Sequence, residues 1–173
     1  MSKLILFTRA VILSSAIILS SCFSTKAQDT FYDMDSVQTI EIFFTSGLNW
    51  DSIMDSNIAS GNYLVADQVI VNGSVYYGAG VKYKGNSSYS LTRAKNPLHI
   101  KLDYTVSQDY QGYQDIKLAN GFSDPTMIRE VSSYSVLRKY MDGPRCNYAK
   151  VYINGSYWGL YTNSEDIGNN FLE

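Results

Sequence analysis

The order of apolar and polar positions along the chain predicts a protein built mainly from strands. Residues 37–43 (VQTIEIF) contain a polar–apolar alternation over residues 39–42, which is typical of a strand with one buried face. Residues 98–102 (LHIKL) alternate in the same way, so we expect His99 and Lys101 on the face opposite the leucines and the isoleucine. Further strands are predicted over residues 63–71, 74–84, 114–119, 147–153 and 156–165.

Two asparagine–glycine pairs predict tight hairpins. Asn72-Gly73 separates the predicted strands 63–71 and 74–84, and Asn154-Gly155 separates the last two strands. This dipeptide tolerates the positive φ angles of a two-residue type I′ turn. We therefore expect neighbouring strands to pair in an antiparallel manner.

The spacing of apolar residues, together with residues that typically begin or end helices, predicts two helices. A short one is expected within residues 48–58, with Gly61 as its stop. A long one is expected after Ser123-Asp124-Pro125, which supplies a capping residue and a proline for the first turn, and Gly143-Pro144 should end it. Its apolar stripe consists of Met127, Val131, Tyr134, Leu137 and Met141. The predicted fold class is α+β: a mainly antiparallel sheet with hairpins, strands in sequence order, and one long helix packed on one face.

The first 28 residues are interpreted as an export signal of lipoprotein type. A basic start precedes a ten-residue apolar run, residues 10–19, which is too short to span a bilayer comfortably. The sequence around Cys22 fits a lipobox, in which this cysteine would be lipidated, whereas residues 25–27 (TKA) fit ordinary cleavage. We expect an extracytoplasmic, lipid-anchored protein of the cell envelope, with simple secretion as the alternative. Residues 29–36 are predicted to be a polar lead-in to a single domain, residues 37–173.

Composition narrows the function classes. The chain has 173 residues, 45% of them hydrophobic, and a formal net charge of −2, which argues against a disordered tail and against a nucleic-acid-binding surface. Aromatic residues make up 14% and favour a sheet-rich body. Cys146 is interpreted as a small buried hydrophobe in preference to a catalytic thiol, because the one histidine, His99, has no spacing that suggests a partner.

Three parts of the sequence could contribute to a binding or catalytic site. The segment 84–88 (KGNSS) directly follows a predicted strand and could offer backbone N–H groups and hydroxyls to phosphate oxygens, although it also fits a solvated turn. Lys101 could reach a phosphate, or it could extend along the surface. Glu165, if buried, would need a cation, which Lys101 or Lys95 could supply.

Read in order, four motifs resemble the spore coat protein CotH family, whose members are atypical, secreted or cell-surface protein kinases. The matching stretches are residues 84–88 (KGNSS), 95–102 (KNPLHIKL), 120–129 (NGFSDPTMIR) and 152–161 (YINGSYWGLY), followed by Glu165. Two departures are visible: Lys84 stands where the family often has arginine, and residues 162–164 (TNS) are more polar than expected.

The resemblance implies the amino-terminal lobe of a kinase-like domain that helps to hold ATP and Mg²⁺. On that analogy the loop formed by Gly85, Asn86, Ser87 and Ser88 would lie over the phosphates. Lys101, with Lys95 as runner-up, would neutralise them, and Glu165 would fix the lysine or assist the metal. The residues given structural roles are Asp124 as a cap, Arg129 as a brace, Gly159 and Tyr161.

The resemblance also leads us to expect a truncated family member. The family's acidic catalytic residues lie in a second lobe beyond the tyrosine hairpin, so phosphate transfer by this chain unaided is not expected. The implied partners are ATP and a secreted or surface protein that carries a Ser or Thr acceptor. The alternative is a lipid-anchored surface binding or adhesion module without catalysis, for which exposed aromatic residues would suffice.

Overall fold

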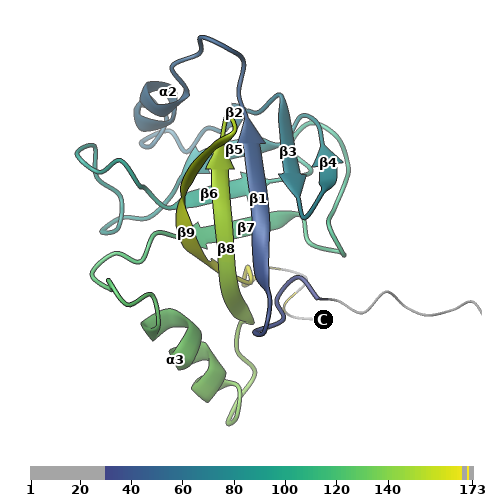
Figure 1. Cartoon of the computed structure of the whole chain (residues 1–173), viewed down its shortest axis with the longest axis vertical. Coiled ribbons are helices and arrows are strands. Elements are labelled where there is room, and N and C mark those ends of the chain that lie inside the picture. The colour runs from purple at the N-terminus through teal and green to yellow at the C-terminus, as the bar shows by residue number, and fades with distance from the viewer. Residues whose placement is uncertain (1–29, 169–170, 172–173) are drawn as a thin grey trace, which may run out of the picture.

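The computed structural model describes residues 30–168 and residue 171 (Figure 1). Its strands belong to one sheet in the order β2-β5-β6-β7-β9-β8-β1-β3-β4. The strands are β1 (Val37–Phe43), β2 (Leu64–Val65), β3 (Gln68–Val71), β4 (Ser74–Tyr76), β5 (Gly80–Tyr83), β6 (Leu98–Lys101), β7 (Asp115–Ala119), β8 (Cys146–Ile153) and β9 (Ser156–Ser164). The helices of the described residues are α2 (Trp50–Ser56) and α3 (Arg129–Leu137).

The predicted fold class is wrong. The structure is mostly a nine-stranded, curled half-barrel of mixed type with two short helices, instead of a mainly antiparallel sheet with one long packed helix. The strands do not follow sequence order, because β1 lies between β3 and β8 and runs parallel to β8. A parallel contact between residues more than a hundred positions apart leaves no hairpin signal, so the local pattern could not indicate it.

The curl arises where the predicted strands 63–71 and 74–84 are each broken. In the first, β2 pairs with β5 at one edge of the sheet, and β3 pairs with β1 near the other edge. Only Ala66 and Asp67 separate β2 from β3, and residues 77–79 separate β4 from β5. These short connections join the two edges of the sheet, which bends it around its core.

Both turn asparagines extend the pairing of β1. Asn72 donates its backbone N–H to the Thr39 carbonyl at 2.9 Å and accepts the Thr39 N–H on its side chain at 2.8 Å. Asn154 does the same with Ile42 and Phe44, at 2.9 and 2.8 Å. Each hairpin turn therefore stabilises the neighbouring strand as well as its own.

The inner face of the curled sheet is the apolar core. Alternate residues of the strands point inward and are fully buried, as the alternation in residues 37–43 and 98–102 predicted. The group includes Ile40, Ile42, Val69, Val71, Val81, Leu98, Ile100, Ile116, Leu118 and Val151. Burying a side chain of this size contributes roughly 1.5–3 kcal/mol, so the inner face holds the fold together.

The described part of the predicted lead-in, residues 30–36, contributes more to the core than a polar segment would. Phe31 and Tyr32 are buried, and their rings meet those of Tyr110 and Tyr113. The buried amide of Asn147 donates to the Phe31 carbonyl at 3.0 Å. This aromatic group covers one side of the core beside β8.

The predicted long helix is wrong at both ends. Helix α3 begins at Arg129 because Met127 adopts a left-handed conformation, with φ of 58°, and interrupts the chain after Pro125. It ends at Leu137, well before Gly143. Tyr140 and Met141 are exposed, so no packing extends the helix over them.

Candidate functional site

The outer face of the curled sheet carries the charged residues. Lys82 on β5, His99 on β6 and Lys117 on β7 lie side by side in the strand register, and Lys117 pairs in turn with Ser164 on β9. These positions alternate with the buried residues of the same strands, so the pleat that buries the core also places the charges outside.

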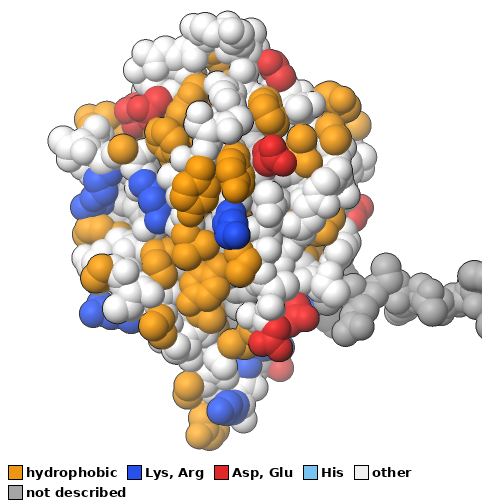
Figure 2. All heavy atoms as spheres, viewed as in Figure 1, with side chains coloured by type: hydrophobic (Ala, Val, Ile, Leu, Met, Phe, Trp, Pro, Cys, Tyr) orange, Lys and Arg blue, Asp and Glu red, His pale blue; other side chains and the backbone are white. Residues whose placement is uncertain are grey.

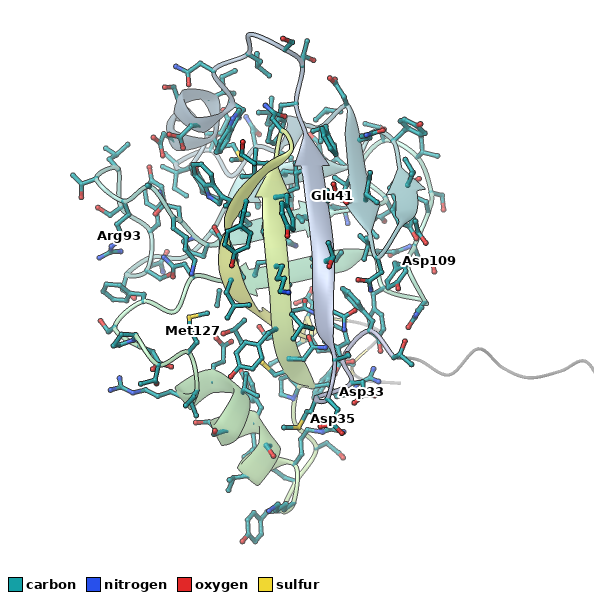
Figure 3. All side chains as sticks on the ribbon, viewed as in Figure 1. Asp33, Asp35, Glu41, Arg93, Asp109 and Met127 are labelled. Carbon is teal, nitrogen blue, oxygen red and sulfur yellow. The ribbon has the colours of Figure 1, made fainter. Side chains whose placement is uncertain are left out.

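The glycine loop connects β5 to β6 at one end of this row. Gly85 has φ of +94°, and a Cβ there would collide with the Ser88 hydroxyl, so glycine is required. The Ser88 carbonyl accepts hydrogen bonds from Arg93 at 2.9 Å and from Asn120 at 3.1 Å. Asn86 and Ser87 are exposed at the tip. Arg93 lies further along the same connection, which projects from the body in Figure 3.

Lys84 stands between this loop and α3. It lines a cavity of about 430 Å³ together with Gly85, Ser88 and Glu130. Burial lowers the pKa of Lys84, although the charge of Glu130 opposes that change. Burial likewise raises the pKa of Glu130, against the effects of hydrogen bonding with Ser164 and of the charge of Lys84. Within the described part of the chain, Lys84 forms no ion pair within 4 Å, so it is a partly desolvated cation that lacks a close anion.

Lys101 lies elsewhere on the outer face and is already paired. Its ammonium is 3.0 Å from the Asp103 carboxylate and 3.8 Å from that of Asp115. The hydrogen bond to Asp103 is the main reason that the pKa of Lys101 is raised. Lys101 lines a second cavity, of about 220 Å³, whose wall also includes Asp115, Glu165 and Asp166.

Glu165 is buried and is bound by Arg145. The guanidinium contacts both carboxylate oxygens, with Nη2 to Oε1 at 2.9 Å and Nε to Oε2 at 3.3 Å, and the Arg145 backbone N–H donates to Oε2 at 3.0 Å. Glu165 and Lys101 share a cavity wall, but the cation that the buried Glu165 requires comes from Arg145.

Lys95 lies later in the same connection between β5 and β6, apart from both cavities. Its ammonium lies 4.8 Å from the centre of the Tyr161 ring, and burial lowers its pKa. Gly159 makes this contact feasible, because a Cβ there would come within 3.2 Å of the Lys95 side chain. The Tyr161 hydroxyl donates to the Asn96 carbonyl at 3.0 Å.

The structure therefore does not gather the sequence-predicted residues into one pocket. Gly85 and Ser88 line the cavity of Lys84, Lys101 and Glu165 line another, and Lys95 packs on Tyr161. The binding roles assigned to these residues stay predictions, as does that of Cys22, which lies outside the described residues.

Asp124 and Arg129 meet at the start of α3. The Asp124 carboxylate accepts the Arg129 backbone N–H at 2.8 Å and the Thr126 hydroxyl at 2.6 Å, and the Arg129 side chain donates to the Ser123 carbonyl at 2.9 Å. The Thr126 hydrogen bond is the main reason that the pKa of Asp124 is lowered. The helix has no side-chain cap at Ile128, so Asp124 supplies the acceptor from four residues earlier.

Sequence reasoning missed Lys117 and Glu130, and it gave Lys84 no role. A signal for Lys117 was present, because it alternates with Ile116 and Leu118 on a predicted strand as Lys101 does on its own. Glu130 could not be found in this way, since its approach to Lys84 depends on where α3 packs. The two residues lie 46 positions apart and come together only in the folded chain.

The described residues contain no group of three or more His, Cys, Asp or Glu side chains that could hold a metal ion. Neither α2 nor α3 has the length and apolar character that a membrane-spanning helix requires.

The fold and the site define a curled β-sheet protein whose outer face carries lysines beside a glycine loop and a helix-borne glutamate. A family model described as CotH kinase protein matches residues 81–173, which is more than half of the chain. The chain therefore belongs to the CotH kinase family, and the resemblance read from the motifs is confirmed. A search of curated proteins gave no match.

Proposed function

We propose that the chain is the nucleotide-binding part of an atypical protein kinase and that it binds ATP on the outer face of the sheet, between the glycine loop and α3. The observation that carries this proposal is Lys84, a partly desolvated cation that lines one cavity with Gly85, Ser88 and Glu130. Family membership supports a kinase-like role in general.

The arrangement has the parts that protein kinases use to hold a triphosphate. In those enzymes a glycine-rich loop covers the phosphates, and a lysine paired with a helix-borne glutamate contacts them. Here the glycine loop joins β5 to β6, Lys84 begins it, and Glu130 lies in the first turn of α3. Lys84 would form charge-assisted hydrogen bonds to phosphate oxygens, and Glu130 would hold its ammonium in place.

This geometry favours Lys84 over Lys101 for the phosphates. Asp103 and Asp115 already neutralise Lys101, so an incoming phosphate would have to compete with two carboxylates. Lys84 has no such competitor within 4 Å among the described residues. Mg²⁺ would accompany the nucleotide, bound mainly by its phosphates, and we assign no residue to it.

We also propose a class of protein substrate and a cellular location. The acceptor would be a Ser or Thr hydroxyl of a secreted or surface protein, and the protein would act outside the cytoplasm, tethered through a lipid on Cys22 or simply secreted. These parts rest on the resemblance and on the signal-like residues 1–28.

Calorimetric titration of the full chain with ATP and Mg²⁺ tests the proposal. Lys84→Met should weaken ATP binding about tenfold or more, because it removes a charge-assisted hydrogen bond in a partly desolvated site. Lys101→Met should weaken it less, and Lys150→Met, at an exposed lysine on β8, should leave it unchanged. No measurable heat with the wild-type chain would overturn the proposal. A larger loss with Lys101→Met than with Lys84→Met would transfer the phosphate site to Lys101.

A surface binding module is the second candidate, and an aromatic patch favours it. Figure 2 shows hydrophobic side chains gathered over β8 and β9. Tyr152 and Tyr157 pack with ring centres 5.4 Å apart, and Tyr157 is exposed. An adhesive role would survive Lys84→Met and be lost on Tyr157→Ser, measured as retention of the purified chain on immobilised cell-surface material. Loss of retention with Lys84→Met, together with unchanged retention of Tyr157→Ser, would exclude the adhesive role.

A further inference from the structure

A third cavity, of about 400 Å³, opens on the other side of Lys84. It lies on the outer face of β5, β6 and β7, between the glycine loop and the turn at Gly61, and it continues the charged row of the sheet. Its polar and charged lining consists of Lys82, Lys84, Asn86, His99 and Lys117. Three lysines and a histidine line this cavity without a carboxylate among its described lining residues, which is the composition of an anion site.

Each lysine has a different local environment. Lys82 donates to the Gly61 carbonyl at 3.0 Å and lies 4.2 Å from the centre of the Tyr63 ring. Lys117 contacts Asp166, which lines the neighbouring cavity of Lys101. Lys84 has no ion pair within 4 Å among the described residues. Among the described residues, Asp166 is the one carboxylate within 4 Å of these lysines, and Glu130 acts on Lys84 from the neighbouring cavity.

His99 lies at the centre of a hydrogen-bonded chain. Its Nε2 is 2.8 Å from the Asp115 carboxylate, and its Nδ1 is 3.2 Å from the Tyr63 hydroxyl. The acceptor Asp115 places the proton of the neutral ring on Nε2, so the Tyr63 hydroxyl donates to Nδ1. When the ring gains a second proton, Nδ1 donates and the tyrosine oxygen accepts. Both states keep both hydrogen bonds, so the charge can change without rearranging the strand.

The charges around His99 come from every neighbouring segment. Lys82 on β5 and Lys117 on β7 pair with His99 in the strand register, and Lys101 follows two residues later on its own strand. Asp115 on β7 hydrogen-bonds to the His99 Nε2, and Asp166 after β9 contacts Lys117. Tyr63 stays neutral over the physiological range, because burial raises its pKa to about 12. Both ring nitrogens are occupied, so His99 would act on a bound anion through its charge.

We infer that this cavity is a binding site for a tetrahedral oxyanion of the phosphate class, with Lys82, Lys84 and Lys117 as its cations and the Tyr63–His99–Asp115 chain as the element that strengthens binding in acid. The site does not require a nucleotide. The anion is a free phosphate or the phosphate of a larger molecule, and both present the same oxygens to the lysines.

Calorimetric titration of the full chain with sulfate tests this inference, since sulfate stays a dianion between pH 5.5 and pH 8. His99 is the one histidine of the chain, so the difference between the wild type and a variant without this ring shows how much of any change in affinity over this range belongs to it. We expect sulfate binding to strengthen about fivefold from pH 8 to pH 5.5, as one added charge near the anion would give. His99→Gln should remove this pH dependence, and Lys82→Met should weaken binding at both pH values.

The controls distinguish loss of the anion site from unfolding of the variant, and failure of this inference from failure of the ATP-binding proposal. Lys150→Met should bind sulfate as the wild type does, and urea unfolding checks that each variant is folded. If His99→Gln does not fold, His99→Asn replaces it, with the same expected loss of pH dependence. Absence of sulfate binding overturns the site, and pH-independent binding overturns the role of His99. Parallel titrations with pyrophosphate and ATP identify the source: binding of ATP alone would leave the proposed function standing and overturn this inference, whereas binding of sulfate and pyrophosphate without ATP would do the reverse.

Discussion

The inner and outer faces of β5, β6 and β7 are built from alternate residues of the same short strands, yet they have opposite properties. On β6 the inward residues Leu98 and Ile100 are fully buried, whereas His99 and Lys101 face outward, where His99 hydrogen-bonds to Asp115 and Lys101 lies 3.8 Å from the same carboxylate. The side chains of the inner face are already packed against one another. The outer face keeps Lys84 without a close anion in the described part of the chain, and three cavities open on it. The apolar contacts that stabilise the fold therefore lie on one face of the sheet, and the charges and cavities that we propose as binding sites lie on the other.

Substitution of adjacent residues on β6 tests this division most strongly. Ile100→Ala should lower the free energy of unfolding by about 3 kcal/mol, because it removes buried methyl groups and leaves a cavity at the centre of the core. Lys101→Ala should cost no more than about 1 kcal/mol, because its ion pairs are partly exposed. Urea unfolding of both variants gives the comparison. Equal losses would show that the outer charges also hold the sheet together.

The outer face should also give the protein an acid-sensitive contribution to stability that the inner face lacks. The hydrogen bond from His99 is the main reason that the pKa of Asp115 is lowered from 3.8. A carboxylate whose pKa is lower in the folded state stabilises the fold above its unfolded value and loses that contribution as the pH falls below it. The wild type should therefore lose stability below pH 3.8 more steeply than Asp115→Asn, measured by urea unfolding across this range. Parallel curves for the two proteins would contradict the assignment.

The reactivity of Cys146 tests whether every part of the outer face is open to solvent, and it is the smallest of the expected effects. It lies on the outer face of β8 but is buried, and burial raises its pKa to about 12. The thiol should react with iodoacetamide at pH 8 far more slowly in the native chain than in urea, because the thiolate is the reactive form. Mass spectrometry of the modified peptide provides the measurement, and a Cys-containing model peptide gives the reference rate. Rapid native labelling would show that this part of the outer face is open to solvent.

The sequence predicted local structure well where a pattern repeats within a few residues. Alternation located β1, β6 and β7, and the pairs Asn72-Gly73 and Asn154-Gly155 located two hairpins. It failed where pairing partners are distant in the chain, as with the parallel contact of β1 and β8 and with the breaks between β2 and β3 and between β4 and β5.

The candidate site shows the same limit. The glycine loop was visible as a motif, and its place between two strands was predicted correctly. The partners of its neighbours were not predictable: Arg145 binds Glu165, Asp103 and Asp115 bind Lys101, and none of these contacts follows from a spacing. An ion pair forms between whichever charges the fold brings together, so pairing needs the structure.

The amino-acid sequence by itself determined the family, the alternation that gives each strand a buried and an exposed side, and the glycine loop with the lysine before it. These depend on residue types and on spacings of a few positions, which the printed chain contains in full. Only the tertiary structure decided that the sheet curls, that α3 is short, and that Lys84 lies opposite Glu130 while Lys101 and Glu165 are held by other residues. Those outcomes depend on distances between segments far apart in the chain, and packing of the core fixes them.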